Sequence, residues 1–203
     1  MFLTPVSAVE AAYGNATGKA VPLSEQYLMD CSWGKGPQGP NEGCMGGFQD
    51  QAFEFLAEGG YVPTAEGYPY AGVNQYCPGQ TPTPAVRFRG QWFVVDGGEN
   101  ATRAALVKYG PLAVSIDASA DEWVFYKSGV YDAPTCHTAA ADLDHGVTLM
   151  GYGEEGGVPY WLVKNTWSQH WGEGGYIRVA RRPDDCGITT QPIYMRMEVL
   201  HGE

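Results

Sequence analysis

Residues 144–176 read DHGVTLMGYGEEGGVPYWLVKNTWSQHWGEGGY, and two apolar runs in this stretch, residues 147–150 and 159–163, predict neighbouring strands. His145 precedes the first run, and Asn165 follows the second. Trp167 and Trp171 come shortly after. A histidine whose ring is oriented by a carboxamide can act as the base for a thiol nucleophile. The stretch therefore predicts two members of a catalytic site, His145 and Asn165, walled by indoles.

Working outward, the two parts of the chain differ in their periodicity. Up to about residue 86 the pattern indicates helices and loops, and beyond it short apolar runs alternate with glycine-rich turns, as in an antiparallel, barrel-like sheet. The sequence predicts an α+β fold with a helical lobe over residues 1–86, a β lobe over residues 87–203, and a cleft between them. Expected helices cover residues 4–13, 23–30, 48–58 and 99–109; expected strands lie near residues 86–88, 92–95, 112–116, 147–150, 159–163 and 176–179; a glycine-rich loop covers 34–47.

The net charge and the spacing of the cysteines limit which partners and which kinds of site are expected. The 203-residue chain carries a formal charge of −11 with only 12 Lys and Arg, so nucleic acid and anionic membranes are poor partners. No apolar run approaches the length needed to span a membrane. The five cysteines show no Cys-x-x-Cys spacing, which argues against a metal site and favours disulfides in an oxidising compartment, with one cysteine left over.

Several linked motifs resemble the papain-like cysteine proteases, in particular the cathepsin L group, over about residues 8–195. The motifs occur in the order of that family: residues 23–26 (LSEQ), 30–31 (DC), 43–47 (GCMGG), 68–70 (YPY), 110–112 (GPL), 144–146 (DHG) and 165–167 (NTW). The resemblance implies a two-lobe α+β fold, a C-terminal tail that packs back toward the helical lobe, no cofactor, and a monomer. It also implies peptide or protein substrates, proteinaceous inhibitors as partners, and a secreted or lysosomal, vesicular location.

The resemblance assigns roles in the chemistry. His145 would hold a thiol as thiolate and later protonate the leaving amine, so its imidazole would titrate near the working pH. Asn165 would fix the rotation and tautomer of the ring, Trp167 would cover their bond, and Trp171 would line the leaving-group side. The other three histidines, His137, His170 and His201, have no such context and are expected to be ordinary surface residues.

Substrate would be held by residues from both lobes. Gly46 and Gly47 would offer a bare backbone edge to an extended peptide, with a tight turn as the alternative. The remaining candidates would line the adjoining pocket or the cleft around the histidine; Phe48 has an alternative role as helix core. These candidates are Phe48, Gln49, Ser115, Asp144, Gly146, Trp167 and Trp171.

By the same resemblance Cys31 pairs with Cys77 and Cys136 with Cys186, while Cys44 stays unpaired. The nucleophilic cysteine is expected immediately before Met1 and the glutamine that binds the oxyanion earlier still, so the sequence is interpreted as N-terminally truncated and is predicted to be inactive. Two alternatives remain. One is a non-catalytic protein that binds peptides or inhibitors in the cleft, and the other is an incomplete gene model of an active enzyme. Cys44 as the nucleophile is disfavoured, because nothing nearby in the sequence would lower its pKa.

Overall fold

The structure is a computed structural model that describes residues 3–33, 41–59, 61–83, 85–87, 90–132 and 135–197. Most of the expected glycine-rich loop, Phe88 of an expected strand, and His201 lie outside these residues. The chain divides into two compact units, Met1–Phe93 with Met195–Glu203, and Val94–Tyr194.

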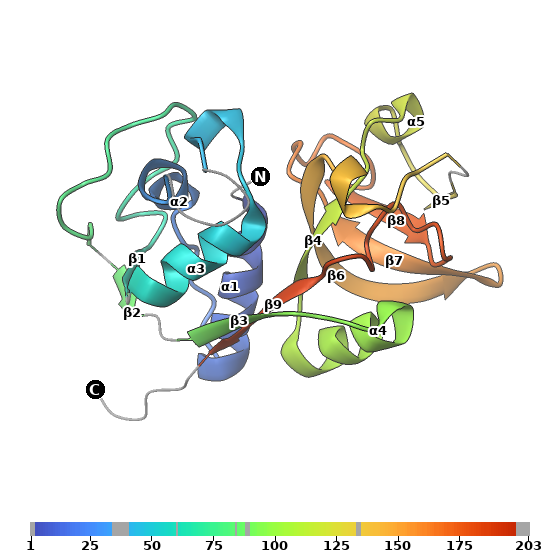
Figure 1. The fold of residues 1–203 in the computed structure, drawn as a ribbon, viewed down its shortest axis with the longest axis horizontal. Coiled ribbons are helices and arrows are strands. Elements are labelled where there is room, and N and C mark those ends of the chain that lie inside the picture. The colour runs from blue at the N-terminus through green and yellow to red at the C-terminus, as the bar shows by residue number, and fades with distance from the viewer. Residues whose placement is uncertain are drawn as a thin grey trace. The chain divides into compact units, whose positions relative to one another are not determined.

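The first unit is mainly helical (Figure 1). It contains α1 (Leu3–Thr17), α2 (Glu25–Cys31), the 3-10 turn η1 (Gly43–Met45), α3 (Gln49–Gly59) and a small antiparallel pair of β1 (Tyr61–Pro63) and β2 (Ala85–Arg87). Ser24 begins α2 as the sequence predicts, since its hydroxyl accepts a hydrogen bond from the Tyr27 amide. The buried core of the unit includes Val9, Leu28, Ala52, Phe53, Leu56 and Val62.

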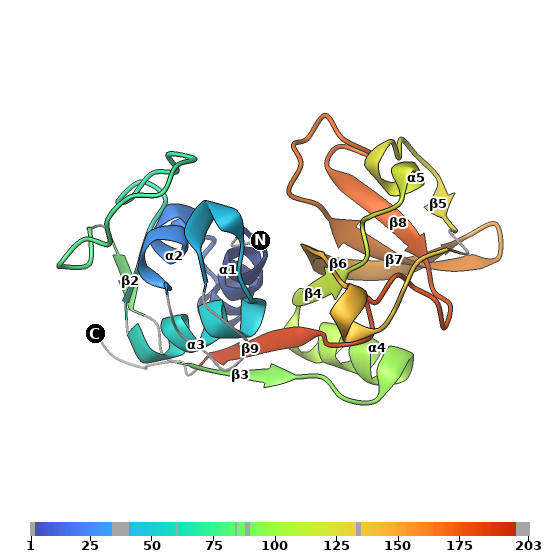
Figure 2. The same ribbon diagram turned by 45° about the horizontal axis from the view of Figure 1, so that its top comes forward.

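The second unit is built on antiparallel strands: β4 (Leu112–Ile116), β6 (His145–Glu155), β7 (Val158–Lys164) and β8 (Tyr176–Ala180). β5 (Val130–Tyr131) adds to β8 in parallel at one edge, and Figure 2 shows it there together with α5 (Asp121–Val124). β3 (Gly90–Val94) and β9 (Ile193–Met197), whose residues are divided between the two units, complete the order β3-β9-β4-β6-β7-β8-β5. The sheet is thus open in the described part of the chain, and the α+β class is confirmed.

One hairpin determines where the predicted site lies. Gly156 and Gly157 both have positive φ, 58° and 81°, which the tight two-residue turn between β6 and β7 requires. The resulting register pairs Thr148 with Lys164. Asn165 therefore follows β7 at the end of the sheet where β6 begins with His145.

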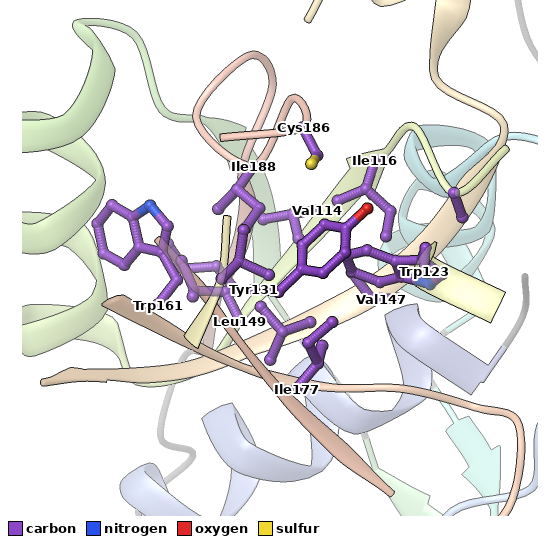
Figure 3. Close-up of a cluster of buried hydrophobic side chains, with 14 of the residues drawn as sticks. Val114, Ile116, Trp123, Tyr131, Val147, Leu149, Trp161, Ile177, Cys186 and Ile188 are labelled. Carbon is purple, nitrogen blue, oxygen red and sulfur yellow. The ribbon is translucent and has the colours of Figure 1, made fainter. Parts of the chain in front are cut away.

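The core of the second unit holds the sheet and its helices together. α4 (Gly98–Tyr109) contacts β4 and β6, and the short 3-10 turn η2 (Ala140–Asp142) precedes β6. Figure 3 shows the buried apolar side chains of this core, and the indoles of Trp123 and Trp161 are among the largest of them. The labelled members are Val114, Ile116, Trp123, Tyr131, Val147, Leu149, Trp161, Ile177, Cys186 and Ile188. Burial of this set supplies the main driving force for folding of the unit.

Candidate active site

His145 and Asn165 form a hydrogen-bonded pair within the second unit. Nε2 of His145 lies 2.8 Å from Oδ1 of Asn165, although the two residues are 20 positions apart in the sequence. The backbone also holds Asn165 in place, because its amide donates to the carbonyl of Gly175 at 2.9 Å. Asn165 as a whole is only 6% exposed, so the bond is largely shielded from solvent.

The neighbours of Asn165 decide which tautomer the imidazole takes. The Thr166 amide donates to the same Oδ1 atom at 2.7 Å, so that atom has to be the oxygen and not the nitrogen of the carboxamide. An oxygen acceptor requires a proton on Nε2 of His145. The Nδ1 lone pair of the neutral ring is then the one that can accept a proton from another group.

One indole lies against His145, and a second indole supports the first. The ring centre of Trp167 is 4.9 Å from that of His145, and Trp171 packs edge-on against Trp167 at 5.6 Å. Trp171 is anchored in turn, because its Nε1 donates to the carbonyl of Val124 at 2.9 Å. Trp167 thus lies against the imidazole, and its role of covering the bond between His145 and Asn165 stays a prediction.

Burial sets the protonation of His145. It lowers the pKa of the imidazole, and it outweighs the hydrogen bond to Asn165 and the nearby Asp144 carboxylate, which both act to raise the pKa. The pKa of His145 is thus below its usual value despite the Asp144 carboxylate, and the ring is neutral at neutral pH. A thiolate close to Nδ1 would favour the imidazolium, so the net pKa of His145 depends on a partner of opposite charge.

The other second-unit candidates surround His145. Ser115 lies opposite Gly146 in the β4–β6 register, and Ile116 lies opposite His145. Asp144 ties the start of β6 to the next loop, since its Oδ1 accepts from the Ala118 amide at 2.9 Å. Ser115, Asp144 and Gly146 are thus brought together with the histidine by the sheet itself.

The remaining candidates belong to the first unit. A side chain at Gly47 would collide with that of Asn41, whose Oδ1 accepts from the Phe48 amide, whereas a side chain at Gly46 would meet open space. Phe48 is exposed and precedes α3, so the alternative of a helix-core residue is wrong. Gln49 is buried at the start of α3. Gly47 therefore also has a local packing reason to be glycine.

The five cysteines are all accounted for. Disulfides join Cys31 to Cys77 and Cys136 to Cys186, the pairings that the resemblance implies. Cys44 is free and exposed on the first unit, and its sulfur lies 3.6 Å from that of Met29. Within the described residues no cluster of three His, Cys, Asp or Glu side chains could hold a metal ion, and no helix is both long and apolar enough to cross a bilayer.

One histidine differs from its expected role as an ordinary surface residue. His137 is exposed, yet its Nδ1 lies 2.8 Å from Oδ2 of the buried Asp117, which raises the pKa of His137. Burial alone would raise the pKa of Asp117, but hydrogen bonds from Ser119 and His137 outweigh it and hold that pKa far below its usual value. The pair was missed because its members lie 20 residues apart with no motif around them.

The fold and the pair together define a class: an α+β protein with a histidine–asparagine couple of the kind that activates a thiol. A family model described as papain family cysteine protease matches residues 3–196, and the chain belongs to that family. Human cathepsin L2 is 41% identical over 192 residues, which cover 92% of this chain and 56% of that protein. Digestive cysteine proteinase 1 of Homarus americanus is 40% identical, with the same shares covered.

Solved structures agree with this assignment. Bromelain from Ananas comosus, in complex with the inhibitor E64, superposes with a TM-score of 0.84 at 35% identity. The match covers 97% of this chain and 88% of the bromelain chain. The ragweed pollen cysteine protease Amb a 11, in its proform, gives a TM-score of 0.85 at 32% identity over 97% of this chain and 59% of its own. The chain spans about half the length of the curated relatives it matches.

Proposed function

We propose that the chain carries the base and the orienting residue of a cysteine-type endopeptidase. The single observation that carries the proposal is the 2.8 Å contact of His145 Nε2 with Asn165 Oδ1. It leaves Nδ1 as the atom that takes the thiol proton and later delivers it to the leaving amine. Papain-family membership supports the same chemistry.

For the 203 residues by themselves, we propose that they do not hydrolyse peptide bonds. Four of the five cysteines are in disulfides, which leaves Cys44 as the one free thiol of the described residues. Its sulfur lies 3.6 Å from the thioether sulfur of Met29, which is not a base that could activate it. A site without its nucleophile retains binding but loses acyl transfer.

A labelling experiment tests this. The 203-residue chain is incubated with E64 and analysed by intact mass and peptide mapping, with Cys44→Ser as the matched control. We expect no stoichiometric adduct on either chain. An adduct on Cys44 that disappears in the control, accompanied by peptide hydrolysis, would show that Cys44 is the nucleophile.

A second experiment tests the base. A chimeric chain, extended before Met1 by a papain-family segment that carries the family's oxyanion-binding Gln and nucleophilic Cys, is assayed on fluorogenic peptides. Hydrolysis is expected, and His145→Ala is expected to abolish it, whereas His170→Ala, which replaces an exposed histidine, is expected to leave it intact. Hydrolysis that survives His145→Ala would remove His145 from the mechanism.

The alternative is a non-catalytic protein that holds peptides or inhibitors. Exposed Phe48 and the open backbone at Gly46 favour an extended peptide, and E64 is bound in the related bromelain structure. Sequencing the coding DNA upstream of Met1 distinguishes the two. An in-frame Gln followed by Cys-Gly-x-Cys supports the enzyme, and a stop codon supports the binding protein. The two disulfides support a secreted or lysosomal location for either.

A further inference from the structure

Glu173 and Arg178 form an ion pair in the second unit, close in sequence to Trp171, and we call this pair the clamp. Glu173 lies in the loop between Trp171 and β8, and both of its carboxylate oxygens bind Arg178 of β8. Oε1 accepts from Nη2 at 2.6 Å, and Oε2 accepts from Nε at 2.8 Å. Oε1 also accepts from the Gly129 amide at 2.9 Å, 44 residues away. The single carboxylate thus joins three segments of the chain with paired, charge-assisted hydrogen bonds.

The loop that Glu173 anchors carries two contacts to the candidate active site. At its start, Trp171 packs against Trp167, which covers His145. At its end, the Gly175 carbonyl accepts from the amide of Asn165. A displacement of this loop would therefore reach both the cover of the imidazole and the residue that orients it.

The backbone of the loop has little freedom to compensate. Gly172 has a φ of +56°, and a side chain there would meet the Tyr176 carbonyl at 2.5 Å and the ring of Tyr126 at 3.0 Å. Tyr126 is itself fixed, because its hydroxyl donates to the Gly129 carbonyl at 2.6 Å. The clamp at Glu173 and the packing around the adjacent Gly172 thus both restrain the start of the loop.

A neighbouring carboxylate offers a matched comparison. Glu155, at the end of β6, also pairs with Arg178, at 2.7 Å from Nη1. Its side chain is 58% exposed, whereas that of Glu173 is 26% exposed. Glu155 lies at the hairpin turn and not in the loop that contacts Trp167 and Asn165. Both glutamates satisfy the same guanidinium, but only Glu173 connects it to the site.

We propose that Glu173, held by Arg178 and the Gly129 amide, is a positioning residue that keeps Trp171 and the Gly175 carbonyl in place and thereby holds the His145–Asn165 pair. A role for Glu173 in catalysis rests on the function proposed above, whereas its effect on the position of the His145–Asn165 pair does not. The pKa of Glu173 is lowered, chiefly by the hydrogen bonds from Arg178, so the clamp stays ionised into acidic solution. Its support for the pair is present above the usual pKa of a glutamate and is lost only as the pH falls through the lowered value.

The test compares Glu173→Gln with Glu155→Gln in the 203-residue chain. Two readouts are taken by NMR: the pKa of His145, and hydrogen exchange of the Asn165 amide, the donor to Gly175. In Glu173→Gln we expect the pKa of His145 to rise toward that of a solvated histidine, because the imidazole becomes more hydrated. We expect exchange at Asn165 to become roughly tenfold faster, as for the loss of a charged hydrogen bond.

In Glu155→Gln both quantities should stay at their wild-type values, although both variants remove a carboxylate from Arg178. Equal responses in the two variants, or an unchanged Asn165 and His145 in Glu173→Gln, would overturn the proposal and leave the clamp as a structural ion pair. Glu173→Asp keeps the charge but shortens the reach, and an intermediate response is expected. Neither readout uses peptidase activity, so failure of the proposed function would leave these results unaffected.

Discussion

Replacing Trp167 with alanine would uncover the His145–Asn165 pair. Trp167 is 38% exposed, so about three fifths of the residue's surface, on the order of 150 Å² for a tryptophan, is out of water. At about 25 cal/mol per Å², and with some burial retained in the unfolded chain, Trp167→Ala should lower the free energy of unfolding by about 2–4 kcal/mol. Burial is the main cause of the lowered pKa of His145, so that pKa should rise toward the ordinary histidine value.

Denaturant titration measures the first quantity, and a ¹⁵N-histidine NMR titration measures the second. Phe125→Ala is the matched control, because Phe125 is 73% exposed and makes no ring contact with His145 among those the structure describes. The control should change both quantities little. A pKa of His145 that stays constant or falls in Trp167→Ala would refute the account in which the indole keeps water from the imidazole.

Three further outcomes are expected. The His137–Asp117 pair stabilises the fold below the ordinary histidine pKa and loses that contribution as the pH rises through the raised pKa of His137. His137→Gln should therefore lower the melting temperature more at pH 5 than at pH 8. Equal losses of melting temperature at the two pH values would argue against the pair. Replacing both Cys136 and Cys186 by serine should cost about 4 kcal/mol by loop entropy, because the bridge closes a loop of 50 residues, and a denaturant titration showing a loss below about 1 kcal/mol would contradict this. Ser24→Ala should cost about 1 kcal/mol in the same measurement, since Ser24 caps α2, and an unchanged midpoint would speak against the cap.

Local signals predicted much of the fold. The expected helix at residues 99–109 corresponds to α4 (Gly98–Tyr109), and the expected strand at residues 112–116 to β4 (Leu112–Ile116). α1 (Leu3–Thr17), however, continues past Gly14, where a helix end was expected, because Gly18 with a φ of +72° provides the termination. Glycine within a helix weakens it without ending it when the surrounding residues are packed.

Pairings between distant segments could not be predicted from local patterns. β5 (Val130–Tyr131) has two residues and forms only because β8 is available as its partner. β9 (Ile193–Met197) has an apolar pattern that was not interpreted as a strand. Short strands of this kind depend on tertiary contacts more than on intrinsic propensity.

For the candidate site too, local patterns predicted some residues but not the groups that hold them in place. His145 and Asn165 could be predicted, because His145 comes shortly before one apolar run, Asn165 comes shortly after the next, and the two runs flank a tight glycine turn. The partners that fix them could not: the Gly175 carbonyl and the Thr166 amide are backbone groups, and the Gly129 amide that binds Glu173 lies 44 residues away. Backbone donors and acceptors carry no residue-type signal, so only the structure reveals them.

The most direct test of the central claim is the tautomer of His145. A long-range ¹H–¹⁵N spectrum of the neutral side chain distinguishes a proton on Nε2 from a proton on Nδ1. We expect Nε2–H, donated to the Asn165 oxygen, with Nδ1 free to receive a proton from a thiol. A spectrum showing the Nδ1–H form, or one in which Asn165→Ala leaves the Nε2 signals unchanged, would contradict this expectation.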